Sequence, residues 1–249
     1  MARSGSHDYR LTTLAHDYWE EGTEMLVRDR MTRNPVSVAP EMVVPEALEL
    51  LKRNEIRRLP VIGNGKLIGM VTQMDLLRVS PTPATSLAVW EIPALVAKIR
   101  VKEVMSRKVI TIGPDQPIED AALLMREKMI GGLPVVDKGE LVGIITETDI
   151  FDAFVDVLGV KQGGTRITLE VADRIGSLAE VTGLAKDLGI NILSLVTLPG
   201  EGGWARATFR VKGRRIAELV EEMKSRGLKI LHVFPDTDKH TNKTNKRSS

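Results

Sequence analysis

The sequence predicts a mixed fold of the α+β and α/β classes, in which two repeated βαββα units precede one βαββαβ unit. Three observations predict it: an ungapped internal repeat, apolar periodicities that recur in both copies, and a C-terminal region without a counterpart earlier in the chain. The length of 249 residues points the same way, because one compact domain usually holds about 100 to 200 residues. More than one hydrophobic core is therefore expected.

The internal repeat begins with VRDRMTRNPVSV in the first copy and VKEVMSRKVITI in the second. Matched positions keep a constant offset of 74 residues: Met31 and Met105, Pro60 and Pro134, Asp75 and Asp149. A repeat of this length without gaps indicates duplicated structural units rather than chance similarity. We expect the first unit at 25–80, a linker helix at 81–100 and the second unit at 101–160.

Each copy predicts the order strand, helix, strand, strand, helix. Val36 and Val38 alternate as a short strand, and Pro45 suits the first turn of the following helix. Apolar residues then recur at the i, i+3, i+4, i+7 spacing of one helix face: Val44, Ala47, Leu48 and Leu51, and in the second copy Ile118, Ala121, Ala122 and Met125. Two strands around a glycine-containing turn and a last helix complete each unit.

The region 166–235 predicts a separate unit of order βαββαβ, which defines a ferredoxin-like sandwich. Its first strand alternates at Ile167, Leu169 and Val171. Its two helices carry apolar faces: Leu178, Val181, Ala185 and Leu188 in the first, Ile216, Leu219, Val220 and Met223 in the second. Two strands join around the turn GEGG, and a final strand ends near Val233.

The repeated residues resemble the CBS domain. Each copy has MT or MS before a short strand, then RRLPVI or GGLPVV, then LIGMVTQMD or LVGIITETD. The resemblance runs from Val27 to about Ala153 apart from the linker, and a tandem pair is similar to a Bateman module. It implies that the two units pack pseudo-symmetrically around a cleft for adenosine ligands such as AMP, ADP, ATP or S-adenosylmethionine. No obligatory cofactor is implied beyond this regulatory ligand.

The Thr and Asp of each TxxD motif stand at a helix start, where side chains and free backbone N–H groups converge. An ionised Asp can accept hydrogen bonds from two ribose hydroxyls, and the Thr hydroxyl can donate to a phosphate oxygen. With the adenine-framing positions that the resemblance adds, we expect nucleotide site 1 at Val36, Ser37, Arg57, Arg58, Pro60, Thr72 and Asp75. Site 2 is expected at Ile110, Thr111, Gly132, Pro134, Thr146 and Asp149.

Alternative interpretations stay open for these residues. A Thr followed three positions later by Asp also forms a capping box, which stabilises any helix by about 1 kcal/mol. Arg57 and Arg58, which Gly131 and Gly132 replace in the second copy, would favour an anionic phosphate tail. They equally suit a solvated face. If the arginines do contact the ligand, the two sites are unequal.

The residues ADRIGSLAEV and LGINILSL resemble the ACT domain, whose members often bind amino acids at a subunit interface. The resemblance covers nearly all of 166–235 and implies these ligand-contacting residues: Asp173, Ile175, Gly176, Leu178 and Asn191. The helix N-terminus after Gly176 attracts a carboxylate, and the Asn191 amide can contact polar groups. Alternatively, Asp173 and Asn191 only cap and turn the chain, and the domain is a dimerisation surface.

Composition argues against several classes of function. The net charge of +2 and the lack of a basic stripe do not fit a nucleic-acid partner. No apolar run reaches the ~18 residues of a membrane span, and the chain has no cysteine, which fits a reducing cytoplasm. No nucleophile with a base, no paired carboxylates and no metal-ligand spacing stand out, so neither an enzyme nor a metal site is expected.

Both ends are expected to lie outside the folded units. The residues EEGTE before Met25 can be encoded by a purine-rich run resembling a ribosome-binding site, which indicates a translation start at Met25. A genuine flexible arm at 1–24 is the alternative. The tail 236–249 is polar and without periodicity, which predicts disorder.

These features predict a non-catalytic, cytoplasmic regulatory sensor that controls an unidentified protein partner. The two resemblances imply a homodimer, because CBS pairs and ACT domains commonly self-associate. A ligand that prefers one arrangement of the repeated units would act by population shift. The order CBS, CBS, ACT is similar to the acetoin-utilisation B-type proteins of bacteria, which implies a role near acetoin or acetyl-group metabolism. The alternative function is a dimeric scaffold with empty clefts.

Overall fold

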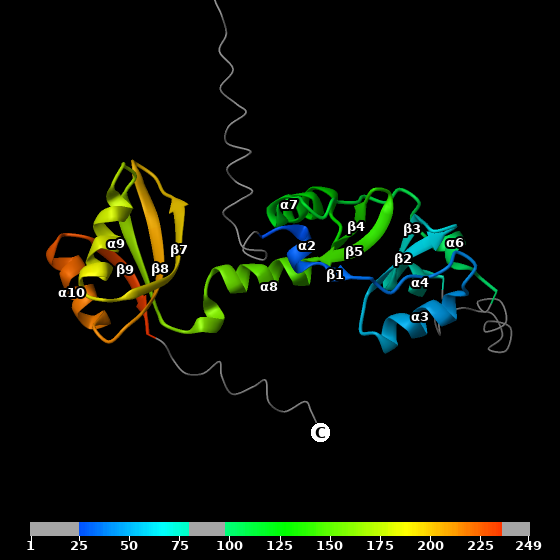
Figure 1. Ribbon diagram of the computed structural model, residues 1–249, viewed down its shortest axis with the longest axis horizontal. Helices are drawn as coiled ribbons and strands as arrows, with labels where there is room; N and C mark the ends of the chain where they lie inside the picture. Colours follow the sequence, from blue (N-terminus) through cyan, green and yellow to red (C-terminus); the bar gives the residue numbers. More distant parts are fainter. Residues whose placement is uncertain (1–24, 80–97, 236–249) are drawn as a thin grey trace, which may run out of the picture. The chain divides into compact units, whose positions relative to one another are not determined.

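The computed structural model describes residues 25–79 and 98–235 (Figure 1). The predicted arm 1–24, nearly all of the predicted linker helix and the predicted tail lie outside the described residues. The chain divides into two compact units, Met1–Ile150 and Phe151–Ser249, and the division falls inside α8 (Glu147–Val157). Of the helices in the described ranges, none combines the length and the apolar character that crossing a membrane requires. The predicted unit 101–160 runs across the division, and its limits stay a prediction.

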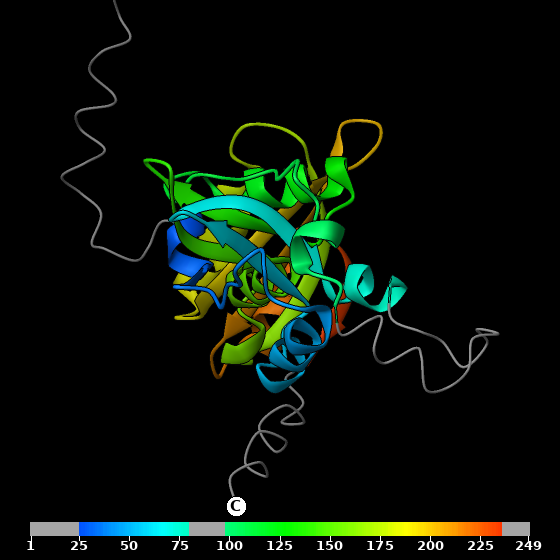
Figure 2. The same ribbon diagram turned by 90° about the vertical axis from the view of Figure 1, so that its right-hand side faces the viewer.

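The first repeat forms a helix, a β-hairpin and a second helix (Figure 1 and Figure 2): α3 (Val44–Arg53), β2 (Arg58–Gly63), β3 (Lys66–Thr72) and α4 (Gln73–Arg78). Pro45 stands in the first turn of α3, where a backbone N–H would have no helical partner. The hairpin turns at Asn64 and Gly65, which have φ angles of 51° and 75°. Two successive positive φ angles are what the tight turn between twisted antiparallel strands requires.

The second repeat follows the same order: α7 (Ile118–Lys128), β4 (Gly132–Asp137), β5 (Glu140–Thr146) and α8. Its hairpin turns at Lys138 and Gly139, again with positive φ. The predicted helix faces are confirmed, because these residues are buried: Val44, Ala47 and Leu51 on α3, and Ile118, Ala121 and Met125 on α7. Leu48 and Ala122, at the edges of these faces, are half-buried.

The predicted strand at Val36 and Val38 is reduced to a single bridge. Val38 pairs in parallel with Val61, and within the described residues from 25 onward the only strand before it is β1 (Thr32–Arg33). The physical reason is that β1 pairs with β5 of the second repeat, whereas Val38 pairs with β2 of the first. The chain between them crosses from one hairpin to the other and cannot run alongside either.

The segments that open the repeats are exchanged. We call residues 25–33 and 99–107 the first and second leading segments; they hold α2 (Val27–Arg30) and α6 (Val101–Val104). The first leading segment lies against the second repeat. There Val27 N donates a hydrogen bond to Gln116 O (2.9 Å), and Thr32 pairs with Ile144.

The second leading segment completes the core of the first repeat in the same way. Val101 N donates to Met42 O (2.9 Å), and Ser106 exchanges backbone hydrogen bonds with Met70 on β3 (2.8 and 2.9 Å). Val101 and Met105 belong to one buried cluster with residues of the first repeat: Val38, Val44, Ala47, Leu51, Leu59, Val61, Val71 and Leu76. Neither repeat is therefore a self-contained unit.

The central glycine of each LhGhh strand allows this exchange. A Cβ built on Gly69 would overlap the thioether of Met105, and one built on Gly143 would overlap that of Met31. The methionines of the leading segments thus lie directly on the backbone of the partner repeat. A side chain at either glycine would push the exchanged segment off the sheet.

The second unit is a four-stranded antiparallel sheet of order β7-β8-β6-β9 with both helices packed on one face (Figure 1). Its elements follow the predicted order: β6 (Thr165–Ala172), α9 (Ser177–Asp187), β7 (Asn191–Pro199), β8 (Trp204–Lys212), α10 (Ile216–Ser225) and β9 (Lys229–Phe234). A 3₁₀ turn, η1 (Val160–Gln162), precedes them. Leu178, predicted to face the core, is exposed, because the buried stripe of α9 runs through Ser177, Val181, Leu184 and Ala185.

Candidate functional site

Each TxxD motif closes a ring of hydrogen bonds at a helix start. Thr72 is the N-cap of α4, and its hydroxyl oxygen accepts a hydrogen bond from Asp75 N (3.2 Å). Asp75 Oδ2 accepts from Thr72 N (2.9 Å) and from the Thr72 hydroxyl (2.7 Å). In the second repeat Asp149 Oδ2 accepts the same two bonds from Thr146, at 2.7 and 2.8 Å. The capping interpretation therefore holds for both motifs.

The capping bonds leave one carboxylate oxygen of each motif available. Both aspartates bond through Oδ2, and no hydrogen bond from another described residue reaches Oδ1 of Asp75 or Asp149. The threonine hydroxyl protons, in contrast, are already donated to the aspartates. The expected donation from Thr72 or Thr146 to a phosphate would need that bond to be exchanged, so the free carboxylate oxygen is the better placed ligand contact.

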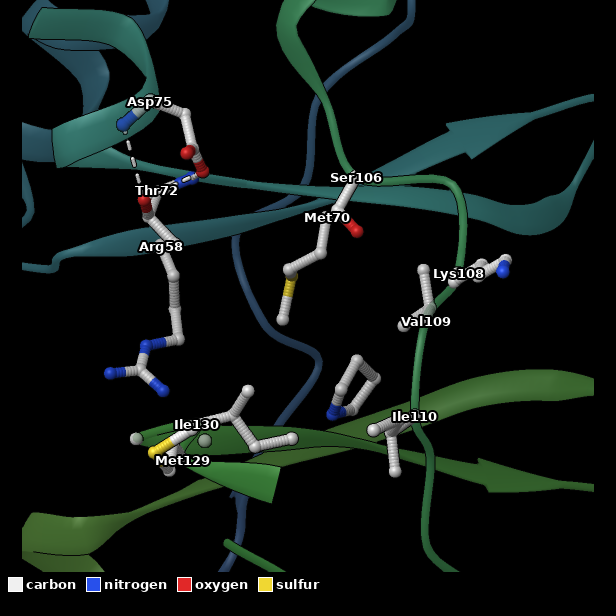
Figure 3. A pocket seen from close by; sticks show the side chains of 13 residues that line it. Arg58, Met70, Thr72, Asp75, Ser106, Lys108, Val109, Ile110, Met129 and Ile130 are labelled. Atoms are coloured by element: carbon white, nitrogen blue, oxygen red, sulfur yellow. Dashed lines mark hydrogen bonds between the residues drawn. The ribbon is translucent and has the colours of Figure 1, made fainter. Parts of the chain in front are cut away.

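A cleft of about 270 Å³ lies beside Asp75 and is named here the Asp75 cleft (Figure 3). The first repeat supplies one side of it: Arg58, Met70, Thr72 and Asp75. Ser106 of the second leading segment and residues of the second repeat supply the other: Lys108, Val109, Ile110, Ile130, Gly132 and Pro134. The volume is close to the lower end of the range for small-molecule sites, about 300 to 1,000 Å³.

A second cleft, of about 370 Å³, lies beside Asp149 and is named the Asp149 cleft. Its make-up mirrors the first. The first repeat supplies Val36, Glu55, Ile56, Arg57, Arg58 and Pro60. The second repeat supplies Thr146, Glu147 and Asp149. Each cleft thus combines the TxxD motif of one repeat with the LPV strand of the other.

The structure distributes the candidate residues differently from the predicted grouping of one site per repeat. Of the predicted site 1, Thr72 and Asp75 line the Asp75 cleft. The Asp149 cleft is lined instead by Val36, Arg57 and Pro60. Arg58 lines both clefts. Of site 2, Ile110, Gly132 and Pro134 line the Asp75 cleft, whereas Thr146 and Asp149 line the Asp149 cleft. Ser37 and Thr111 are exposed and line neither cleft.

The exchange of the leading segments is the physical reason for this regrouping. β1 pairs with β5 of the second repeat, so the chain that follows β1 still lies beside that repeat. Val36 therefore lines the same cleft as Thr146, before the chain returns to the first repeat. Sequence reasoning also missed Ile56 and Ile130, a matched apolar pair that lines the two clefts. Their signal was available, since both stand four residues before a cleft proline.

Arg58 has the most perturbed environment among the cleft side chains. Burial lowers the pKa of its guanidinium, the nearby carboxylates of Glu147 and Asp149 oppose that shift, and the charge of Arg57 adds to it. The side chain forms no hydrogen bond or ion pair with any other described residue. An arginine stays protonated at neutral pH in any case, so a partly desolvated cation with no directly bonded partner in the described part of the chain lies at the clefts.

The loop after β6 offers donors in the second unit. Gly176 has a φ of 91° and is the N-cap of α9, which receives no side-chain cap. Ile175 is fully exposed, whereas Ser177 is buried and its hydroxyl has no partner among the described residues. Asp173 N is already bonded to Gly203 O (2.8 Å). The open N–H groups of α9 and the Ser177 hydroxyl, which sequence reasoning missed, are the groups left for a ligand.

Asn191 does not lie with this loop. It begins β7 and pairs with Lys212, at the end of the sheet where β6 starts at Thr165. Asp173 follows the other end of β6, about 26 Å from Thr165 at about 3.3 Å per residue. A single amino acid cannot touch both residues within one chain, so the predicted amino-acid site is divided between the two ends of the sheet.

Comparison with known proteins gives matches to both units. The family model of the CBS domain matches residues 27–82 and 101–156, and that of the TTHA0829-like ACT domain matches 163–234. A CBS domain-containing protein of Dictyostelium discoideum is 33% identical over 137 residues, which cover 54% of this chain and 94% of that protein. The CBS domain-containing protein YhcV of Bacillus subtilis is 30% identical over 142 residues, which cover 57% and 92%. The crystal structure of AcuB from Vibrio cholerae, a candidate acetoin utilization protein, has 31% identity, covers 56% of this chain and 96% of that chain, and has a TM-score of 0.47.

Proposed function

Because the chain belongs to the CBS-domain proteins and carries an ACT domain after its two CBS domains, we propose that it is a non-catalytic sensor of adenosine nucleotides. The observation that carries the proposal is the make-up of the composite clefts. In each of them a carboxylate with one free oxygen, an apolar wall and an arginine line one cavity of small-molecule size. Those groups match the ribose, the adenine and the phosphate of a nucleotide in turn.

The roles in the Asp75 cleft follow from this match. Oδ1 of Asp75 accepts hydrogen bonds from the ribose hydroxyls, because Oδ2 is occupied by the cap. The adenine packs against the apolar side, which includes Ile110, Ile130 and Pro134. Arg58 and Lys108 attract the phosphate. In the Asp149 cleft, Asp149, Ile56 and Arg57 take the corresponding roles.

The second unit is proposed to respond to an amino acid at the loop after β6 or to hold two chains together. The uncapped N-terminus of α9 and the buried, unpartnered Ser177 hydroxyl support the ligand role. In a homodimer, Asn191 of a second chain could reach the loop that it cannot reach within its own chain. We propose that nucleotide and amino acid act together on a cytoplasmic protein partner, with acetoin or acetyl-group metabolism as the first context to test.

The test is thermal unfolding of the full chain with AMP, ADP, ATP, S-adenosylmethionine and a panel of amino acids. A nucleotide at 100 times its dissociation constant is expected to stabilise the clefts by about 2.7 kcal/mol. Asp75→Ala and Asp149→Ala each remove the ribose acceptor of one cleft, so each is expected to abolish the ligand-dependent shift of its own cleft. The ligand-dependent shift is the quantity to compare, since losing a cap alone costs about 1 kcal/mol.

A matched control is Asp29→Ala. Asp29 Oδ2 caps α2 through Leu26 N (3.0 Å) as Asp75 caps α4, but Asp29 lines neither cleft. This variant is expected to lose stability and keep the full nucleotide-dependent shift. The proposal is refuted if no nucleotide shifts the unfolding temperature, an outcome that favours a dimeric scaffold with empty clefts.

A further inference from the structure

Arg58 is shared by the two clefts. It stands at the start of β2, and its side chain lines both the Asp75 cleft and the Asp149 cleft. Figure 3 shows it extending from the side of Thr72 and Asp75 toward Met129 and Ile130 of the second repeat. Gly131 is the other residue that lines both clefts. The two cavities therefore adjoin at the contact between Arg58 and the second repeat.

The repeat makes this position asymmetric. The offset of 74 residues matches Arg58 with Gly132, so the two positions are equivalent in the pseudo-symmetric pair. A Cβ built on Gly132 would overlap the Arg58 guanidinium, and one built on Gly131 would lie 2.7 Å from Arg58 Nη2. A side chain at 132 would therefore require the Arg58 guanidinium to move from its position. The pair carries one guanidinium where strict duplication would place two.

The charges around the two clefts also differ. The Asp75 cleft has Arg58 and Lys108 against the single carboxylate of Asp75. The Asp149 cleft has Arg57 and Arg58 against three carboxylates: Glu55, Glu147 and Asp149. Cations therefore outnumber carboxylates around the Asp75 cleft, whereas carboxylates outnumber cations around the Asp149 cleft even with both arginines counted. A phosphate gains more from the Asp75 cleft for this reason.

We propose that Arg58 is the common phosphate contact of the two clefts, so that an anionic nucleotide bound in one cleft weakens the binding of a second in the other. The Asp75 cleft fills first. This proposal rests on the proposed function and adds its regulation: the pair responds to phosphorylated nucleotides over two separate concentration ranges. An uncharged nucleoside fills both clefts independently.

The coupling follows from the hydrogen-bonding capacity of one side chain. A guanidinium binds a phosphate best through two parallel N–H donors, and in any one side-chain conformation each such pair points at one anion only. A second phosphate has to use the remaining donors, whose direction the first phosphate has fixed, and it lies near the negative charge of the first. We expect the second affinity to fall about tenfold, within the usual range of site-to-site coupling.

The experiment is calorimetric titration of the full chain with AMP and, separately, with adenosine. Asp75→Ala and Asp149→Ala each leave one cleft intact and give the intrinsic AMP affinity of that cleft. In the unsubstituted chain the second AMP enters the Asp149 cleft while the Asp75 cleft is occupied. Its affinity is expected to be about tenfold lower than the affinity of the same cleft in Asp75→Ala, where the Asp75 cleft is empty. Adenosine is expected to show no such difference.

Arg58→Ala is expected to lower the AMP affinity of both clefts and to remove most of the coupling between them. Adenosine affinity is expected to stay unchanged, and this result also shows that the clefts of the variant are folded. Arg57→Ala is the matched control, because Arg57 lines only the Asp149 cleft. It is expected to weaken AMP there and keep the coupling. Arg58→Lys keeps the charge without the planar fork and is expected to retain part of the coupling.

The outcomes separate this inference from the proposed function. Binding of neither AMP nor adenosine overturns both. Adenosine binding in both clefts, together with AMP coupling that is absent or the same in Arg58→Ala, overturns only the role of Arg58. If the unsubstituted chain binds a single AMP while Asp75→Ala and Asp149→Ala each bind one AMP, the inference is supported, because both clefts are competent but exclude each other. If one of these two variants binds no AMP, the inference is overturned.

Discussion

Val101→Asp is expected to unfold the first repeat, although Val101 belongs to the second. Its side chain is fully buried in a cluster with Val44, Leu51 and Leu76. An unpaired carboxylate there has no hydrogen-bond partner and replaces apolar contacts, so the expected loss exceeds about 4 kcal/mol. Hydrogen exchange on the full chain checks it: amides of 44–72 are expected to lose protection before those of 118–146.

The reciprocal variant is the control for this prediction. Val27 occupies the matched position, is equally buried and belongs to the first leading segment. Val27→Asp is expected to deprotect 118–146 first. If each variant instead deprotected the repeat in which it stands, the exchange of leading segments would be incorrect.

Phe209→Ala is expected to destabilise the second unit by about 3 to 5 kcal/mol. Phe209 is 1% exposed on β8, a central strand, and lies between Ile167 of β6 and Leu195 of β7 in the pairing register. Its loss leaves a cavity that the sheet on one side and the helices on the other cannot fill. Denaturant unfolding followed by fluorescence of Trp204, on the same strand, measures the effect.

Phe234→Ala is the matched control, since Phe234 ends β9 and is 53% exposed. Its loss is expected to cost less than about 1 kcal/mol. Nucleotide-dependent stabilisation of the clefts is expected to survive Phe209→Ala, because every residue that lines them lies between 32 and 149. Loss of that stabilisation would show that the two units do not fold independently.

Local patterns predicted most of the fold. The helix faces of α3 and α7, the hairpins that turn at Gly65 and Gly139, and the order of the second unit all follow from periodicity and turn residues. The two family resemblances are confirmed by the matches to the CBS and ACT family models. Leu178 is the instructive exception: a shift of one residue in the helical stripe exposes it.

The partnership between the repeats was not predictable from one sequence. Val27 and Val101 are equivalent, as are Met31 and Met105, so their side chains fit the core of either repeat equally well. Periodicity says which residues are buried but not which copy buries them. The composite clefts depend on that choice, and this is why Asp75 was grouped with Val36 instead of Ile110.

The exchanged leading segments mean that the CBS pair is held together as two interlocked halves. A chain cut between the repeats would yield two fragments, each lacking a buried piece that only the other carries. Neither fragment is expected to fold alone, whereas mixing them would restore one joint core. By the same logic, an ancestral protein with a single repeat could fold only as a pair of identical chains. Gene duplication would then have made that obligatory association permanent within one polypeptide, and freed position 58 to differ from position 132.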